Sequence, residues 1–118
     1  MILVDTSVWI DHLRSGSNLL ATRLHDAAVW THPFVIGELA CGNIGNRAEI
    51  LMLLENLPHI KVATDDEVLF YIDQQKLMGR GIGYVDAHLL AACALAGAKK
   101  LWTLDKRLAT LADTVLTG

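Results

Sequence analysis

Short apolar segments alternate with longer helical patterns along the chain, and this alternation limits the possible folds more than any other feature. Apolar segments of strand length lie at residues 2–4, 29–31, 60–62, 100–104 and 114–116. Strands of a parallel sheet have this continuous apolar character, because helices cover the sheet on both faces. The sequence therefore predicts an α/β fold with a short-stranded parallel sheet.

Helical periodicity fills the intervals between these segments. We expect helices at residues 7–13, 18–27, 33–40, 47–57, 64–78 and 84–96. Pro33 suits the first position of its helix, Thr64 and Glu67 have the spacing of a capping box, and Gly97 is a suitable stop. In a parallel sheet, ligands bind at the carboxyl ends of the strands. Residues that follow the predicted strands are thus the first candidates for a site.

Composition narrows the class of protein. The chain has 118 residues, enough for one domain over residues 1–118, and 53% of them are hydrophobic, which excludes a disordered chain. This apolar content fits either a well-filled core or a surface that a partner covers. No apolar run approaches the roughly 20 residues of a membrane span, and the first residues lack the basic flank of a signal peptide.

Cysteine usage and net charge limit the chemistry. Cys41 and Cys93 lie far apart in apolar helical stretches, so we expect both to be reduced core thiols of a cytoplasmic protein. The net charge of −3 argues against binding nucleic acid by charge alone. A nuclease remains compatible with this charge, because a metal-binding cluster of acids would itself contribute several of the negative charges.

Two aspartates directly follow predicted strands. Asp5 follows residues 2–4, and Asp105 follows residues 100–104. Because parallel strands end at the same edge of a sheet, we expect both carboxylates at that edge. Each aspartate could instead cap the helix that comes after it, which is a common role for this residue type. The sequence leaves both interpretations open.

Two further acids lie on apolar helix faces. Asp86 shares a face with Leu89, and Glu38 shares one with Phe34, so we expect both carboxylates to point inward. His88 is expected to point away on the other side of its helix. A buried carboxylate needs a partner, because an unpaired buried charge is costly, and no Lys or Arg lies on either face. Metal coordination accounts for both acids.

A shared metal site explains why four acids would gather. Four inward carboxylates would raise one another's pKa by repulsion, and a divalent cation removes that conflict. Oxygen ligands suit Mg²⁺ and Mn²⁺, which can activate water and stabilise the charge that develops on a phosphoryl group. We therefore predict a site for phosphodiester hydrolysis in which the catalytic and metal-binding residues are Asp5, Glu38, Asp86 and Asp105.

The sequence around these acids resembles the PIN-domain ribonucleases. The matching motifs are Asp5-Thr6-Ser7, Glu38 in Gly-Glu-Leu, Asp86 in Tyr-Val-Asp-Ala-His-Leu-Leu-Ala-Ala, and Asp105 in Thr-Leu-Asp-Lys-Arg-Leu. Their order and spacing, and the length of the chain, are most similar to the VapC toxins of prokaryotic VapBC toxin–antitoxin pairs. The resemblance covers essentially the whole chain.

This resemblance implies a three-layer α/β/α fold and an endoribonuclease that uses Mg²⁺ or Mn²⁺. It also implies a type II toxin that inhibits translation by cleaving structured RNA, such as tRNA or rRNA. A VapB-type antitoxin would occupy the active-site groove, and a homodimer is common. The four acids would bind the metal directly or through water, and Thr6 and Thr103 would supply supporting hydroxyls.

Four cations flank the segments that carry the acids. They are Arg14, Arg80, Lys106 and Arg107. We expect them around the mouth of the site, where contacts with phosphates would position RNA without reading its sequence. The alternative for each of them is a solvated surface position.

Other kinds of site are less well matched by the sequence. In a haloacid-dehalogenase-like phosphatase Asp5 would be a covalent nucleophile, but a second acid is then required where this chain has Ser7. A phosphoacceptor receiver would need an acid pair before its first helix. The loop at residues 79–83 lacks the glycine spacing of a nucleotide-binding loop. A binding module with a purely structural ion is the non-enzymatic alternative.

Overall fold

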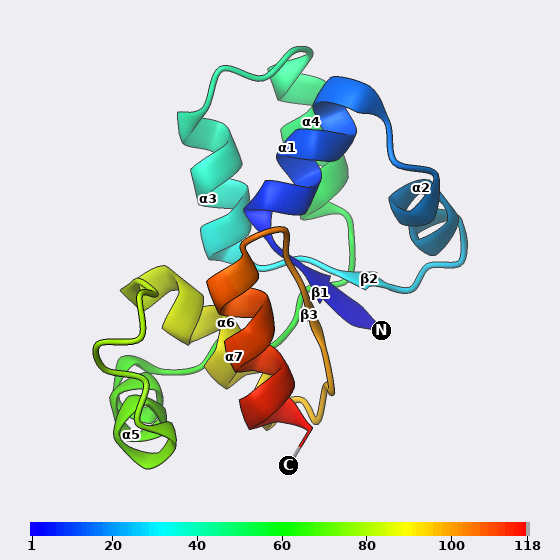
Figure 1. Ribbon diagram of the computed structural model, residues 1–118. Helices are drawn as coiled ribbons and strands as arrows, with labels where there is room; N and C mark the ends of the chain where they lie inside the picture. Colours follow the sequence, from blue (N-terminus) through cyan, green and yellow to red (C-terminus); the bar gives the residue numbers. More distant parts are fainter. Residues whose placement is uncertain (118) are drawn as a thin grey trace.

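The computed structural model describes residues 1–117 and contains a parallel sheet with helices on both sides (Figure 1). Its elements are β1 (Ile2–Val4), α1 (Thr6–Ser15), α2 (Asn18–His25), β2 (Val29–Trp30), α3 (Pro33–Cys41), α4 (Arg47–Glu55), α5 (Asp65–Gln75), α6 (Tyr84–Leu95), β3 (Leu101–Trp102) and α7 (Lys106–Leu116). The predicted α/β class is confirmed, and most helix bounds agree with the sequence patterns to within a few residues.

The sheet has the strand order β2-β1-β3, and both pairings are parallel. Ile2 pairs with Val29, and Val4 pairs with Trp102. Because β1 lies between β2 and β3, the first strand of the chain joins the two edges of the sheet. Because all three strands run in the same direction, the residues that follow them gather at one edge of the sheet.

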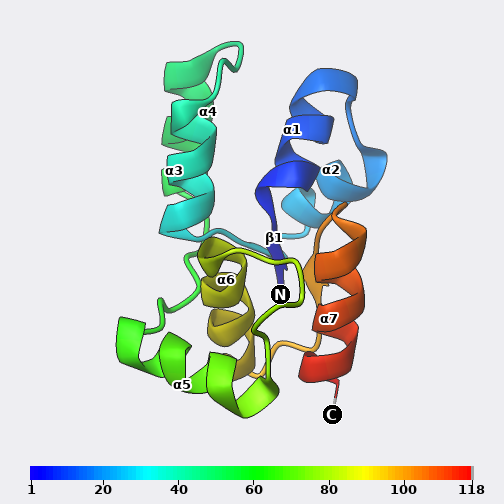
Figure 2. The ribbon, with the colours of Figure 1, turned by 60° about the vertical axis from the view of Figure 1, so that its left-hand side comes forward.

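Helices form a layer on each side of this sheet. Figure 1 shows α1 to α4 above the strands and α5 to α7 below them, and the two groups of helices remain separate in the turned view of Figure 2. Within the first layer α3 packs against α1 and α4, and within the second α6 packs against α5, α7 and β3. The three-layer α/β/α arrangement is therefore as expected. No helix in residues 1–117 is long and apolar enough to cross a membrane.

Two predicted strands are wrong. Residues 60–62 form no strand, and the neighbouring contact is a single parallel bridge between Thr31 and His59. Residues 114–116 belong to the last turn of α7. The buried residues of that helix are Leu108, Leu111, Ala112 and Leu116, whose spacing of three and four residues is helical. The apolar run at residues 114–116 therefore continues the helix instead of forming a separate strand.

The core is centred on α6, in which every residue from position 87 to position 93 is buried. His88 is among them, with 2% of its surface exposed, so the expectation that it points away from the core is wrong. Cys93 is a buried thiol as expected, and burial raises its pKa to about 12. Cys41 lies exposed at the end of α3, which corrects its assignment to the core.

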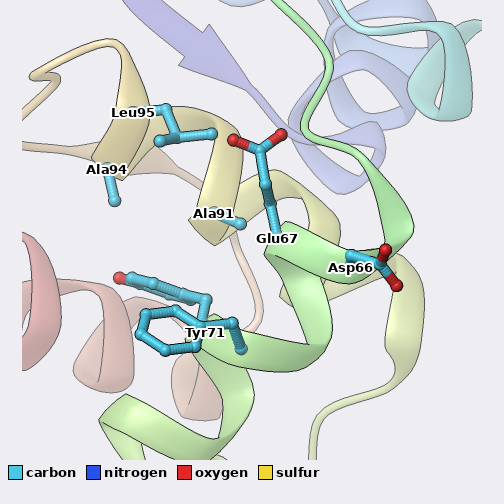
Figure 3. Close-up of a pocket in the computed structure, with 7 residues that line it drawn as sticks. Asp66, Glu67, Tyr71, Ala91, Ala94 and Leu95 are labelled. Atoms are coloured by element: carbon cyan, nitrogen blue, oxygen red, sulfur yellow. The ribbon is translucent and has the colours of Figure 1, made fainter.

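Some apolar side chains stay uncovered although the core is filled. A groove of about 430 Å³ lies between α5 and α6 and is lined by Phe70, Tyr71, Ala91, Ala94 and Leu95 together with Asp66 and Glu67 (Figure 3). Phe70 is 65% exposed and Leu95 is 58% exposed. The two explanations for the apolar composition, a filled core and a partly uncovered surface, thus both describe this chain.

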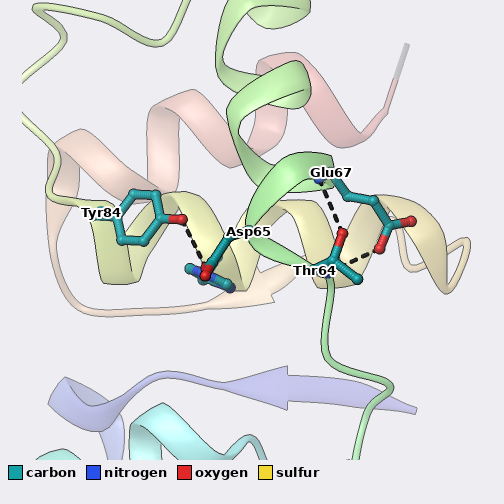
Figure 4. A network of polar contacts seen from close by, with 5 residues as sticks. Thr64, Asp65, Glu67 and Tyr84 are labelled. Carbon is teal, nitrogen blue, oxygen red and sulfur yellow. Dashed lines mark hydrogen bonds and ion pairs between the residues drawn. The ribbon is translucent and has the colours of Figure 1, made fainter.

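The capping box at the start of α5 is confirmed. The Thr64 hydroxyl accepts a hydrogen bond from the Glu67 amide at 3.1 Å, and the Glu67 carboxylate accepts one from the Thr64 amide at 2.8 Å (Figure 4). Both bonds satisfy amides that would otherwise lack partners at a helix start. The box therefore fixes where α5 begins.

Replacement of this cap should lower the stability of the fold measurably. We expect Thr64→Ala to reduce the free energy of unfolding by about 1 kcal/mol, because an alanine side chain cannot accept the amide hydrogen bond. Urea denaturation followed by circular dichroism measures the change. Thr114→Ala, at an exposed position within α7, is the control and should change stability by less than about 0.5 kcal/mol. Equal losses in the two variants would contradict the role of the cap.

Candidate active site

Asp5 lies at the carboxyl end of β1 and is held by two hydroxyl groups. Its carboxylate oxygen Oδ2 accepts hydrogen bonds from Thr103 Oγ1 at 2.7 Å and from Ser7 Oγ at 2.9 Å. Asp5 occupies the N-cap position of α1, but its side chain makes no capping hydrogen bond. Although only 7% exposed, the carboxylate has no cationic partner within residues 1–117. The capping interpretation therefore does not apply to its side chain.

Asp105 lies after β3 and does cap a helix. Its Oδ1 atom accepts hydrogen bonds from the amides of Arg107 at 2.9 Å and Leu108 at 3.1 Å, so the capping interpretation is correct here. The other oxygen, Oδ2, has no hydrogen bond to any group in residues 1–117. The Asp105 amide donates to Thr103 Oγ1 at 3.1 Å. Thr103 thus links the segment carrying Asp105 to the carboxylate of Asp5.

Glu38 reaches the same region from α3. Its Oε1 atom accepts a hydrogen bond from Thr6 Oγ1 at 2.6 Å, which joins α3 to the first turn of α1. The expectation that Glu38 points into the core is wrong, because its side chain is exposed. It lines an open groove of about 720 Å³ together with Pro33, Phe34, Gly37, Cys41, Tyr84 and Val85. The apolar face that Glu38 shares with Phe34 and Cys41 is the wall of this groove.

Asp86 lies in the first turn of α6 and is half-buried. The Gly83 amide donates a hydrogen bond to its Oδ2 at 3.1 Å. Burial raises the pKa of Asp86, and the negative charges of Asp5, Asp105 and Glu38 raise it further, while the Gly83 hydrogen bond opposes them. A carboxyl group that senses all three other acids lies near all three. The four acids predicted from the sequence therefore gather at one end of the sheet.

These acids do not form a closed cage. Within residues 1–117, no group of three or more His, Cys, Asp or Glu side chains is placed so that it could hold a metal ion on its own. An open all-oxygen set still fits a hydrated Mg²⁺, which usually binds through one or two carboxylates and keeps several waters. Burial is the largest cause of the raised pKa of Asp86, and no cation pairs with its carboxylate in residues 1–117. A divalent cation would supply that partner.

The four predicted cations separate into two groups. Arg80, Lys106 and Arg107 line one pocket of about 360 Å³ with Thr110 and Leu111. Arg14 lies near the end of α1, about 12 Å along the helix axis from Thr6, and does not line that pocket. The structure therefore brings three of the cations together and leaves the fourth apart.

Two features of this region were missed by the sequence analysis. Ser7 was named only as part of a motif, yet its hydroxyl contacts Asp5 and accepts a hydrogen bond from the Leu104 amide at 3.0 Å. The second feature is Asp65 in the first turn of α5, whose Oδ1 accepts hydrogen bonds from Tyr84 OH at 3.0 Å and from His88 Nε2 at 3.1 Å (Figure 4). The Tyr84 and His88 bonds lower the pKa of Asp65.

The contact of Asp65 ties the start of α5 to the turn of α6 that carries Asp86. The signal for it was the four-residue spacing of Tyr84 and His88, which places both on one face of a helix. Nothing in the sequence pattern identified Asp65, 19 residues before Tyr84, as their shared acceptor.

The raised pKa of Asp86 makes the stability of the metal-free protein depend on pH. A group whose pKa is higher in the folded than in the unfolded chain stabilises the fold below its unfolded value, here about 3.8, and this contribution is lost as pH rises through the folded value. In chelator, we expect wild-type protein to lose this stability as pH rises from 3.8, whereas Asp86→Asn should not. The free energy of unfolding against pH measures the difference, with exposed Asp113→Asn as control.

Comparison with known proteins agrees with this geometry. The model of the PIN domain family matches residues 2–113. Ribonuclease VapC32 from two strains of Mycobacterium tuberculosis is 53% identical over 108 residues, which cover 92% of this chain and 87% of the relative. The matched region contains all four acids, two at strand ends and two on helices. The chain therefore belongs to the PIN-domain family, and within that family to the VapC-type ribonucleases.

Proposed function

We propose that this chain is a Mg²⁺- or Mn²⁺-dependent endoribonuclease that acts as the toxin of a type II toxin–antitoxin system. Its substrate would be a structured RNA, tRNA or rRNA, whose cleavage inhibits translation. The observation that carries the proposal is the position of Asp5, Glu38 and Asp105 close enough to Asp86 for their negative charges to raise its pKa. Such a cluster is costly unless it binds a cation, and membership in a ribonuclease family supplies the reaction.

The four acids would hold the metal, directly or through water. When bound, a divalent ion activates water and neutralises charge on the phosphodiester. Thr103 fixes one oxygen of Asp5 and Thr6 fixes one oxygen of Glu38, so each carboxylate keeps a defined orientation. Asp105 Oδ1 caps α7, while its Oδ2 accepts no hydrogen bond from residues 1–117. One of these carboxylates would accept the proton that the attacking water loses.

The phosphatase and structural-ion alternatives lose their support. Asp5 Oδ2 already accepts hydrogen bonds from two hydroxyls. One of them belongs to Ser7, at the position where a haloacid-dehalogenase-like phosphatase needs its second acid. Both alternatives also disagree with membership in a ribonuclease family.

The proposal includes two protein partners. A VapB-type antitoxin would occupy the groove beside Glu38, where Phe34 and Tyr84 offer apolar surface next to the acids. The second partner would be another copy of the chain in a homodimer. The exposed Phe70 and Leu95 between α5 and α6 are suited to a contact between the copies. The toxin would act in the cytoplasm, on RNA of the translation machinery.

Removal of one acid should abolish RNA cleavage without unfolding the protein. We expect Asp86→Asn to lower the cleavage rate by more than about 100-fold in Mg²⁺ or Mn²⁺, because the amide carries no charge for a cation. Chelation should have the same effect on the wild type. Gel analysis of end-labelled tRNA and rRNA fragments measures both effects, and Asp113→Asn in α7 is the matched control.

The same experiment can contradict the proposal. Cleavage at the wild-type rate by folded Asp86→Asn protein would remove Asp86 from the site. Cleavage by the wild type in the presence of chelator would show that the reaction needs no metal. Protein that binds Mn²⁺ and gains thermal stability without cleaving any RNA would favour a structural ion.

The two supporting threonines should matter less than the acids but more than an exposed threonine away from the site. We expect Thr103→Val to reduce cleavage about 10- to 100-fold, because Asp5 loses its shortest hydrogen bond while the side chain keeps its shape. Thr6→Val should have a similar effect through Glu38. Thr22→Val, on the exposed face of α2, is the control. Single-turnover cleavage rates measure the effect, and an unchanged rate in both site variants would refute it.

A further inference from the structure

We infer that Arg80, Lys106 and Arg107 form a binding pocket for a backbone phosphate of the RNA strand beside the scissile bond, and that Gly81 holds Arg107 in it. This inference rests on the proposed ribonuclease function, and it assigns to one pocket the contact that orients the substrate. It also distinguishes these three cations from Arg14, which lies elsewhere.

The pocket is built from two segments far apart in the sequence. Arg80 comes from the loop that precedes α6, and Lys106, Arg107, Thr110 and Leu111 come from α7. Figure 2 shows this loop running beside the upper part of α7. The loop ends at Gly83, whose amide contacts Asp86, and α7 begins after Asp105. Both segments of the pocket thus continue directly into residues of the acid cluster.

The charges of the pocket are uncompensated. In residues 1–117 the side chains of Arg80, Lys106 and Arg107 make no ion pair and no hydrogen bond to the protein. Asp105 is the acid nearest in sequence to Lys106 and Arg107, but it accepts a hydrogen bond from the Arg107 amide rather than from the guanidinium. About 360 Å³ of open space faces three positive charges, which suits an anionic group such as a phosphate.

Gly81 explains how Arg107 is held in place. A Cβ atom at Gly81 would lie 2.8 Å from Arg107 Nη1 and 2.9 Å from Arg107 Cδ, so the arginine side chain rests directly on the glycine backbone. Gly81 also has a φ of +81°, a conformation that favours glycine. An arginine already held against the loop loses less freedom on binding than a solvated one. The glycine is therefore part of the pocket.

RNA affinity tests the pocket directly. In the Asp86→Asn background with Mg²⁺, fluorescence anisotropy gives the Kd for a labelled synthetic RNA hairpin with single-stranded flanks. We expect Arg107→Gln and Arg80→Gln each to weaken binding about ten-fold and to lower the salt dependence by about one phosphate contact. Arg23→Gln is the matched control, since Arg23 lines a separate pocket with Trp30, Lys99 and Lys100, and its loss should leave the affinity unchanged.

A pair of glycine variants tests how Arg107 is held. Gly79 and Gly81 both have positive φ, +68° and +81°, so alanine strains the loop at either position. Within the described residues, Arg107 lies against Gly81 but not Gly79, and no atom lies within 4 Å of a Cβ at Gly79. We expect Gly81→Ala to weaken RNA binding as much as Arg107→Gln does, and Gly79→Ala to bind like the parent. Thermal melting of each variant checks that the fold persists.

The outcomes separate this inference from the proposed function. Unchanged RNA affinity in Arg107→Gln and Arg80→Gln would overturn the pocket, and so would equal losses in those variants and Arg23→Gln. Equal effects of Gly81→Ala and Gly79→Ala would overturn the role of Gly81. None of these results bears on cleavage by the wild type. Conversely, RNA cleavage by the Asp86→Asn parent would refute the proposed site, whatever the cations do.

Discussion

The hydrogen bond from Thr103 to Asp5 joins the two ends of the chain at the place where the site forms. Its length is 2.7 Å, and its partners are 98 residues apart in sequence. It extends the pairing of β1 with β3, in which the Asp5 amide donates to Trp102 O at 2.8 Å. Because β1 is the central strand, this pairing fixes the distance between Asp5 and Asp105, and the helices that carry Glu38 and Asp86 pack around it.

The acid cluster is tolerated because each carboxylate has its own hydrogen-bond donors. Asp5 has two hydroxyls, Glu38 has one, Asp105 has two backbone amides and Asp86 has only one. Hydrogen bonds to the charged form lower a carboxyl pKa, whereas burial and neighbouring negative charge raise it. Asp86 combines one donor with half-burial and three acidic neighbours, so it carries the unrelieved repulsion of the cluster. The proposed cation would relieve this repulsion most at Asp86.

Local signals predicted much of the fold, and tertiary packing decided the rest. The capping box of α5, the strand before Asp5 and the long apolar helix α6 each depend on residues close in sequence. The direction of Glu38 was wrong because α3 is apolar on several sides, and only the position of its neighbours decides which side is covered. His88 was misplaced for the same reason, since its acceptor lies on another helix. Periodicity shows which residues share a face but not what that face meets.

The net charge of −3 is a poor guide to nucleic-acid binding in this chain, because opposite charges near the site are kept apart. Asp105 and Arg107 are two residues apart, yet the carboxylate binds the backbone of α7 and the guanidinium rests on Gly81. A direct ion pair between them would cancel both charges. Separate partners leave a negative region suited to a cation and a positive pocket suited to a phosphate, side by side. The proposed cleavage would use both, because the positive pocket would bind one phosphate of the strand while the cation neutralises charge at the scissile phosphate. The positions of the charged groups therefore matter more for nucleic-acid binding than the net charge of the chain does.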